Sequence, residues 1–161
     1  MLIHFKRLSL TLQKDDFRSI LKRASLLASL TSEELWILEM AAKLQEGVAD
    51  FSFQTSGSTG VPKIINLSKD QLIQSAETTL SHFSIKPGAR FLLCIHPQFI
   101  GGAMQVVRAY VNQGQLDVLA PERILDIDHT KYDLVSMVPL QLNKLYKDLK
   151  SHLNDFNHLL I

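Results

Sequence analysis

The sequence predicts an α/β protein with a mostly parallel sheet that is flanked by helices on both faces. The first observation is an order of elements in which short β-type runs alternate with helical runs from residue 64 onward. An alternating order of this kind is typical of an α/β fold with a mostly parallel sheet. The second observation is the composition, because 46% of the 161 residues are apolar, which suffices for a core of about one domain.

The charge and composition of the chain give no indication of a nucleic-acid partner, a membrane-spanning helix or a secretion signal. The net charge is +1 and charged residues make up 20% of the chain, so nothing indicates a nucleic-acid-binding surface. No apolar run approaches the roughly 18 residues of a membrane-spanning helix. Lys6 and Arg7 are not followed by the apolar segment of a secretion signal. The single cysteine, Cys94, excludes an internal disulfide and fits a reducing compartment, so we expect a cytoplasmic protein.

Residues 1–50 are predicted to form a short lead-in of a strand or strand pair followed by two helices. Apolar residues alternate loosely over residues 1–13, and residues 15–29 show the spacings of three and four that are typical of an amphipathic helix. Thr31 and Glu34 have the spacing of a capping box at the start of the second helix, and Gly47 is expected to end it.

The most informative stretch is a loop between two predicted strands. Phe51, Phe53 and Thr55 alternate with polar neighbours, and residues 64–67 form a second β-type run. Between them, glycines allow close backbone approach, successive amides can converge on an anion, and hydroxyls can donate to phosphate oxygens. A lysine adds a positive charge. The residues predicted to hold a polyphosphate are Thr55, Ser56, Gly57, Ser58, Thr59, Gly60 and Lys63.

Three familiar motifs do not fit this loop. A Walker A loop needs a Gly-Lys pair, whereas Lys63 follows Pro62. The glycines at 57 and 60 have no third partner for a dinucleotide fingerprint, and the spacing of a nucleophile elbow is absent as well. A flexible turn rich in serine and glycine is the structural alternative to a phosphate loop.

The remaining elements are predicted from capping residues, periodicity and breakers. Ser68 and Gln71 form a second capping box for a helix that ends near Phe83. Further strands are expected at 90–95, 115–119, 133–138 and 158–161, and further helices at 100–111 and 140–149. Cys94 lies in the first of these strands and is interpreted as a buried structural thiol. Ligands of such sheets gather at the carboxyl ends of strands, which here are followed by His96–Phe99 and by Val138–Pro139.

The nine residues Thr55–Lys63 read T-S-G-S-T-G-V-P-K and resemble the phosphate loop of the acyl-adenylate-forming superfamily. This superfamily includes acyl-CoA synthetases, luciferases and peptide-synthetase adenylation domains. Residues 92–102 are similar to the family's Pro-x-x-His-x-x-Gly segment, with Phe99 in place of the usual histidine. Residues 133–142 resemble its Val-Pro-x-x-Leu segment, and Lys69 replaces a histidine that many members carry. Residues 107–109 and the short lead-in resemble o-succinylbenzoate–CoA ligases of menaquinone biosynthesis.

The resemblance implies the fold of the N-terminal part of these enzymes and an AMP-forming acid–CoA ligase of the EC 6.2.1 type. The substrates would be ATP with Mg²⁺, coenzyme A and a small-molecule carboxylate, in the first place o-succinylbenzoate. The seven loop residues would hold the ATP phosphates. The residues that would contact the acid are His96, Phe99, Gly101 and Arg108.

The resemblance also sets limits. Residues 51–161 match an AMP-binding-type subdomain that stops before the family's adenine, ribose and catalytic-lysine segments. We therefore assign no catalytic residue, expect this chain alone not to form an acyl-adenylate, and expect its partner to be the missing C-terminal part of the same enzyme. No metal site is expected, because the other histidines lack ligand spacing. Two alternatives stay open: a non-catalytic phosphate- or nucleotide-binding fragment, and a ligase of the superfamily for another acid.

Overall fold

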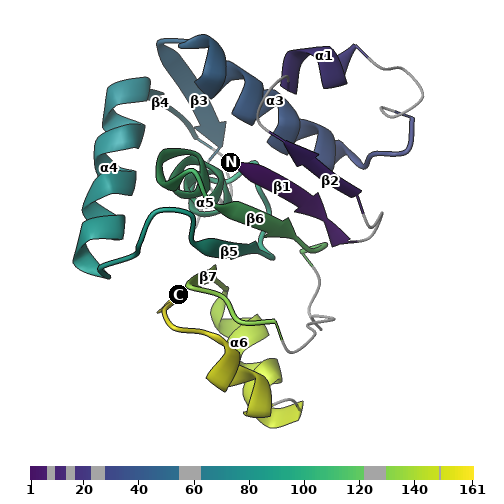
Figure 1. Ribbon diagram of the computed structural model, residues 1–161, viewed down its shortest axis with the longest axis vertical. Coiled ribbons are helices and arrows are strands. Elements are labelled where there is room, and N and C mark those ends of the chain that lie inside the picture. The colour runs from purple at the N-terminus through teal and green to yellow at the C-terminus, as the bar shows by residue number, and fades with distance from the viewer. Residues whose placement is uncertain (7–9, 14–16, 23–27, 55–62, 122–129, 149) are drawn as a thin grey trace.

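The computed structural model describes residues 1–6, 10–13, 17–22, 28–54, 63–121, 130–148 and 150–161 (Figure 1). Its main sheet has six strands in the order β2-β1-β6-β5-β7-β8. Strands β1, β6, β5, β7 and β8 run parallel to one another, and the edge strand β2 pairs antiparallel with β1. The predicted α/β class with a mostly parallel sheet is therefore confirmed. The strands are β1 Leu2–Phe5, β2 Leu10–Gln13, β5 Arg90–Leu93, β6 Gln115–Val118, β7 Leu134–Ser136 and β8 Leu159–Leu160.

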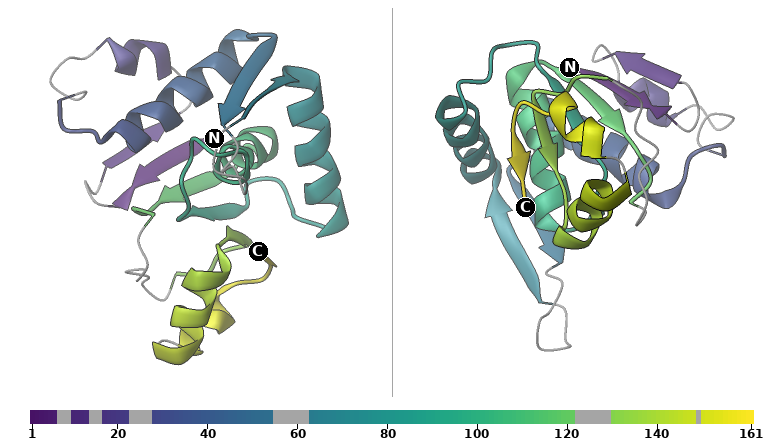
Figure 2. Two further views of the ribbon diagram at one scale, coloured as in Figure 1. Left: turned by 180° about the vertical axis from the view of Figure 1, so that it is seen from behind. Right: turned by 90° about the horizontal axis from the view of Figure 1, so that it is seen from below.

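Helices cover both faces of this sheet (Figure 2). On one face, α3 and α5 pack against each other and onto the buried side chains of Ile3, Phe91 and Leu116. On the other face, Leu145 of α6 packs with Leu92 and other residues of β5 and β7. The helices are α1 Phe17–Leu21, α3 Ser32–Glu46, α4 Lys69–His82, α5 Ile100–Asn112 and α6 Pro139–Asp148, with a 3₁₀ helix, η3, at Lys150–Asp155.

Both predicted capping boxes are present. The Thr31 hydroxyl accepts from the Glu34 amide (3.2 Å), and the Glu34 carboxylate accepts from the Thr31 amide (2.9 Å). Ser68 and Gln71 make the same reciprocal pair at the start of α4. At the other end of α3, Gly47 has φ of 77°, a left-handed conformation that glycine adopts without strain. These local signals explain why the bounds of α3 and α4 agree with the sequence.

Other bounds differ from the sequence prediction. The helix expected over 15–29 is seen as α1, and residues 15, 16 and 23–27 lie outside the described part of the chain. The strand expected at 90–95 ends at Leu93, because Cys94–Phe99 already turn toward α5. Helix α5 closes at Gln113 (φ 57°) rather than at Gly114. Gly114 is needed for space, since a Cβ there would lie 2.2 Å from the Ala89 carbonyl oxygen.

The two strands beside the predicted loop form a separate antiparallel pair. Strand β3 spans Asp50–Gln54 and β4 spans Ile64–Ser68, so that Phe53 faces Ile65 across the pair. Phe51 and Phe53 point into the core, while Ser52 on the other side donates to Asn66 (2.7 Å). This alternation confirms the two predicted strands, and their pairing forms a sheet separate from the parallel one.

Candidate functional site

The hairpin β3–β4 carries the candidate phosphate loop. Gln54 ends β3 directly opposite Ile64, which begins β4, so the two roots of the loop lie side by side. The predicted phosphate-binding residues 55–60 lie outside the described residues. Lys63 is described, is exposed and stands next to the first residue of β4. The structure therefore defines where the loop leaves and rejoins the fold.

The root of the loop meets the beginning of helix α5. Gln54 forms an isolated parallel bridge with Phe99, the residue that precedes α5. Among the described residues, no side chain caps α5 at this end, so its first amide groups have no side-chain acceptor there. The helix dipole places partial positive charge at the same end. A phosphate loop rooted here would add its own amides and Lys63 to an environment that already favours an anion.

Three of the predicted acid-contacting residues come together at this end of α5. The rings of His96 and Phe99 meet edge to face, with centroids 5.9 Å apart. Phe99 is 38% exposed, which is high for a large apolar side chain near a core. Gly101 follows in the first turn, where a Cβ would make an ordinary contact with Ile95 (3.5 Å). The group combines an apolar ring with one titratable side chain.

Arg108, the fourth predicted acid-contacting residue, lies elsewhere. It is two turns along α5, about 12 Å from the helix start at 1.5 Å per residue. Its Nη1 donates to Gln105 (3.3 Å), and its Nε has no hydrogen-bond partner among the described residues. Burial lowers the pKa of the Arg108 guanidinium to about 10. The structure thus does not bring Arg108 together with His96 and Phe99.

Gln105 holds α5 to the sheet and was missed by the sequence analysis. This side chain is fully buried, and its Nε2 donates to the carbonyls of Leu92 (3.3 Å) and Leu134 (3.0 Å). Its Oε1 accepts from Ser136 (3.0 Å) at the end of β7. The available signal was a glutamine inside an otherwise apolar helical run, which must find partners when buried.

Gln141 likewise holds α6 to the sheet. Its Nε2 donates to the Cys94 carbonyl (2.7 Å) and its Oε1 accepts from the Val138 amide (3.1 Å), so it ties the ends of β5 and β7 together. Cys94 itself is buried, and burial raises the pKa of its thiol to about 12. The thiol lies 3.3 Å from the Ser136 carbonyl, in agreement with the structural role that the sequence indicates.

Gly102 is a second residue that the sequence analysis did not single out. A Cβ at this position would lie 2.2 Å from the His96 carbonyl oxygen and 2.8 Å from the Pro97 Cα. Such distances are too short for any side chain. Only a glycine at position 102 lets the β5–α5 connection pass this close to α5. The Gly-Gly pair at 101–102 was the sequence signal.

The described residues lack two features, a cluster of metal ligands and a membrane-spanning helix. They contain no group of three or more histidine, cysteine, aspartate or glutamate side chains that could hold a metal ion. His129 lies outside this part of the chain, so the expectation of no metal site stays a prediction. None of the described helices has the length and hydropathy that crossing a membrane requires.

Comparison with known proteins gives relatives among solved structures. No protein-family model matches the sequence, and no curated protein matches it at a significant level. A crystal structure of an acyl-CoA synthetase (AMP-forming)/AMP-acid ligase II-like protein from Dyadobacter fermentans superposes with a TM-score of 0.75 and 29% sequence identity. The match covers 85% of this chain and 41% of that chain, so this chain spans about two-fifths of the length of that relative.

Two more distant neighbours share the fold. ATP-bound MatB from Rhodopseudomonas palustris has a TM-score of 0.54 and 17% identity, over 67% of this chain and 23% of that one. The o-succinylbenzoate CoA synthetase MenE from Bacillus subtilis, in complex with its acyl-adenylate intermediate OSB-AMP, has a TM-score of 0.55 and 15% identity, over 67% and 30%. The chain therefore has the fold of the N-terminal part of acyl-adenylate-forming enzymes, and its neighbours support that superfamily.

Proposed function

We propose that this chain is the N-terminal part of an ATP-dependent, AMP-forming acid–CoA ligase. One observation carries the proposal: a sequence that resembles the superfamily's phosphate loop is rooted where β3 meets the start of α5. The fold and the Dyadobacter neighbour support the same class of enzyme. The partial coverage of that neighbour supports a further part of the same enzyme as the partner of this chain.

In the proposed reaction, a carboxylate oxygen attacks the α-phosphorus of Mg-ATP, which gives acyl-adenylate and releases pyrophosphate. The CoA thiol then attacks the acyl carbon and releases AMP. The chemistry depends mainly on positioning and on stabilising charge that builds up on phosphate oxygens. We assign the β- and γ-phosphates to residues 55–60 and Lys63, with the amides at the start of α5 contributing positive potential. Mg²⁺ enters with the nucleotide substrate.

For the acid, we infer o-succinylbenzoate as the first substrate to test. The support is the resemblance of residues 107–109 and of the short lead-in. His96, Phe99 and Gly101 would form one wall of the acyl pocket, since they meet at the start of α5. Arg108 is the least supported member of this set, because its guanidinium binds Gln105 two turns away. A cytoplasmic location is part of the proposal and rests on the single cysteine.

ATP–pyrophosphate exchange with the full natural polypeptide tests the function. We expect exchange that depends on an added acid, and a panel containing o-succinylbenzoate identifies which one. Exchange with another acid identifies a different ligase of the superfamily. Nucleotide binding without exchange for any acid would overturn the ligase proposal and favour a non-catalytic phosphate-binding protein.

Substitution of Lys63 tests the assignment of the loop. Lys63→Ala removes a charged donor to phosphate, and we expect the KM for Mg-ATP in the exchange assay to rise roughly tenfold or more. Lys86→Ala is the matched control, because Lys86 is equally exposed but lies in the turn before β5. Equal kinetics for Lys63→Ala and the wild type would remove Lys63 from the site.

A further inference from the structure

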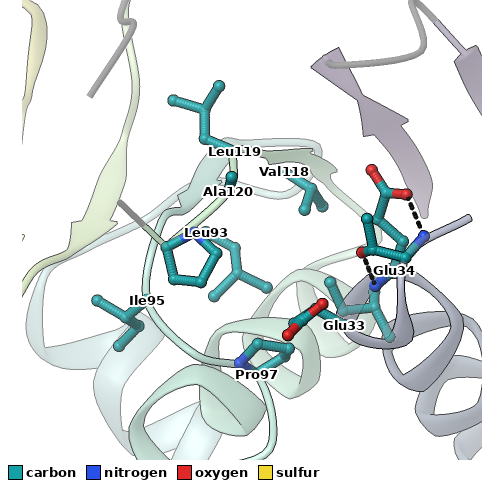
Figure 3. Close-up of a pocket in the computed structure, with 11 residues that line it drawn as sticks. Glu33, Glu34, Leu93, Ile95, Pro97, Val118, Leu119 and Ala120 are labelled. Carbon is teal, nitrogen blue, oxygen red and sulfur yellow. Dashed lines mark hydrogen bonds between the residues drawn. The ribbon is translucent and has the colours of Figure 1, made fainter. Parts of the chain in front are cut away.

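A cavity lies between the start of α3 and the carboxyl ends of β5 and β6 (Figure 3). Its volume is about 150 Å³. None of the residues that line it belongs to the predicted phosphate loop or acyl pocket, although Ile95 and Pro97 are the sequence neighbours of His96. Its apolar wall includes Ile37, Leu93, Ile95, Pro97, Val118 and Leu119.

The size and lining of this cavity suit one small apolar group. A cavity of about 150 Å³ lined mainly by aliphatic side chains is large enough to hold a benzene ring. Leu93 and Ile37 are buried side chains of the core, so the inner wall is fixed by packing on both sides. A single ring or a short branched alkyl group therefore fits the volume.

Two carboxylates, those of Glu33 and Glu34, line this mainly apolar cavity. Figure 3 shows the Glu33 carboxylate extending from α3 toward Pro97 and Leu93. One of its oxygens accepts from the Ser32 hydroxyl (3.0 Å), which leaves further lone pairs of the carboxylate for a donor. Glu34 also lines the cavity, but its carboxylate accepts from the Thr31 amide in the capping box.

The Glu33 carboxylate is held in its charged form. A backbone hydrogen bond within Glu33, the Ser32 hydroxyl and, more weakly, the Thr31 hydroxyl and the nearby His96 keep the pKa of the Glu33 carboxylate below the usual range. No lysine or arginine is among the residues that line the cavity. The cavity therefore attracts a cation and repels an anion at neutral pH.

We propose that this cavity is a binding site for a small apolar group that carries a protonated amine, with the ring or alkyl group among Ile37, Leu93 and Val118 and the ammonium at Glu33. This chemistry differs from that of the carboxylate, nucleotide and thiol substrates of the proposed reaction. The site thus gives the protein a second ligand class, recognised by an apolar volume and one carboxylate.

Titration of the 161-residue chain with benzylammonium chloride at pH 7, followed by amide NMR, tests this site. The expected result is saturable shifts of the Ile37, Leu93 and Val118 amides. Benzyl alcohol, which has the ring without the charge, is expected to bind the same residues about tenfold more weakly, and benzoate is expected not to bind. Absence of saturable shifts with benzylammonium, or shifts that map to another region, would overturn the proposal.

A pair of variants separates the charge from the fold. Glu33→Gln is expected to weaken benzylammonium binding roughly tenfold and to leave the binding of benzyl alcohol unchanged, which shows that the cavity is intact. Asp70→Asn is the matched control, because Asp70 is likewise an acidic residue in the first turn after a capping box. Equal losses in the two variants, or no loss in Glu33→Gln, would contradict the assignment. Neither outcome bears on the ligase proposal.

Discussion

Gly101 and Gly102 are adjacent in the sequence but differ in the space that surrounds each of them. The Gly102 position touches the His96 carbonyl, whereas the Gly101 position has room for a methyl group. We expect Gly102→Ala to lower the free energy of unfolding by roughly 3 kcal/mol, since backbone cannot yield as a flexible side chain does. Gly101→Ala is the control and is expected to be neutral or to gain up to about 1 kcal/mol from helix propensity. Denaturant titration of both variants measures the difference, and equal effects would contradict the close contact.

Cys94 offers a second test at the scale of single residues. Its thiol is buried, and the pKa of about 12 keeps it protonated at neutral and mildly alkaline pH. Because the thiolate is the reactive form, we expect no reaction with a thiol reagent in the native protein at pH 8. The chain unfolded in guanidinium, where the pKa returns to its ordinary value, is the positive control. Rapid native-state labelling would show that Cys94 is accessible.

At the scale of elements, the capping box of α3 has a measurable value. Thr31→Ala removes the acceptor for the Glu34 amide, and we expect a loss of about 1 kcal/mol of stability. Thr78→Ala is the control, because Thr78 is exposed within α4 and its hydroxyl bonds only to the Gln74 carbonyl one turn earlier. Thermal unfolding of the two variants compares them. A loss in Thr78→Ala as large as that in Thr31→Ala would contradict the role of the cap.

The elements that could be predicted are those whose signals are local. The capping boxes, Gly47 and the alternation of Phe51 and Phe53 each act within a few residues, and α3, α4 and β3 appear where these signals place them. Strand ends were less accurate, as at β5, because a periodic pattern does not show where the chain turns toward a helix. The candidate phosphate loop could also be identified from the sequence, because its glycines, hydroxyls and lysine lie within nine consecutive residues.

What the sequence could not show are contacts between distant segments. The pairing of Gln54 with Phe99 joins the loop root to α5, and no periodicity reports it. The bonds of Gln105 to β5 and β7 likewise depend on how the helix lies on the sheet. Arg108 shows the reverse case: it lies in a family-like segment, but the rise of α5 separates it from His96 and Phe99.

In the molecule as a whole, the parallel sheet and the β3–β4 hairpin have different structural roles. The sheet, with α5 fixed to it by Gln105, provides a rigid base, and β3–β4 holds the two ends of the candidate loop above the start of α5. A site held by rigid elements can keep phosphate-binding groups in place before the ligand arrives. We therefore propose that an anion binds between the loop and the start of α5.

Titration of this chain with tripolyphosphate and with Mg-ATP, followed by amide NMR, tests that claim most directly. We expect saturable shifts of the Gln54, Lys63 and Phe99 amides with both ligands, and much weaker binding of both in Lys63→Ala but not in Lys86→Ala. Shifts confined to other residues, or binding that is unaltered in Lys63→Ala, would contradict it.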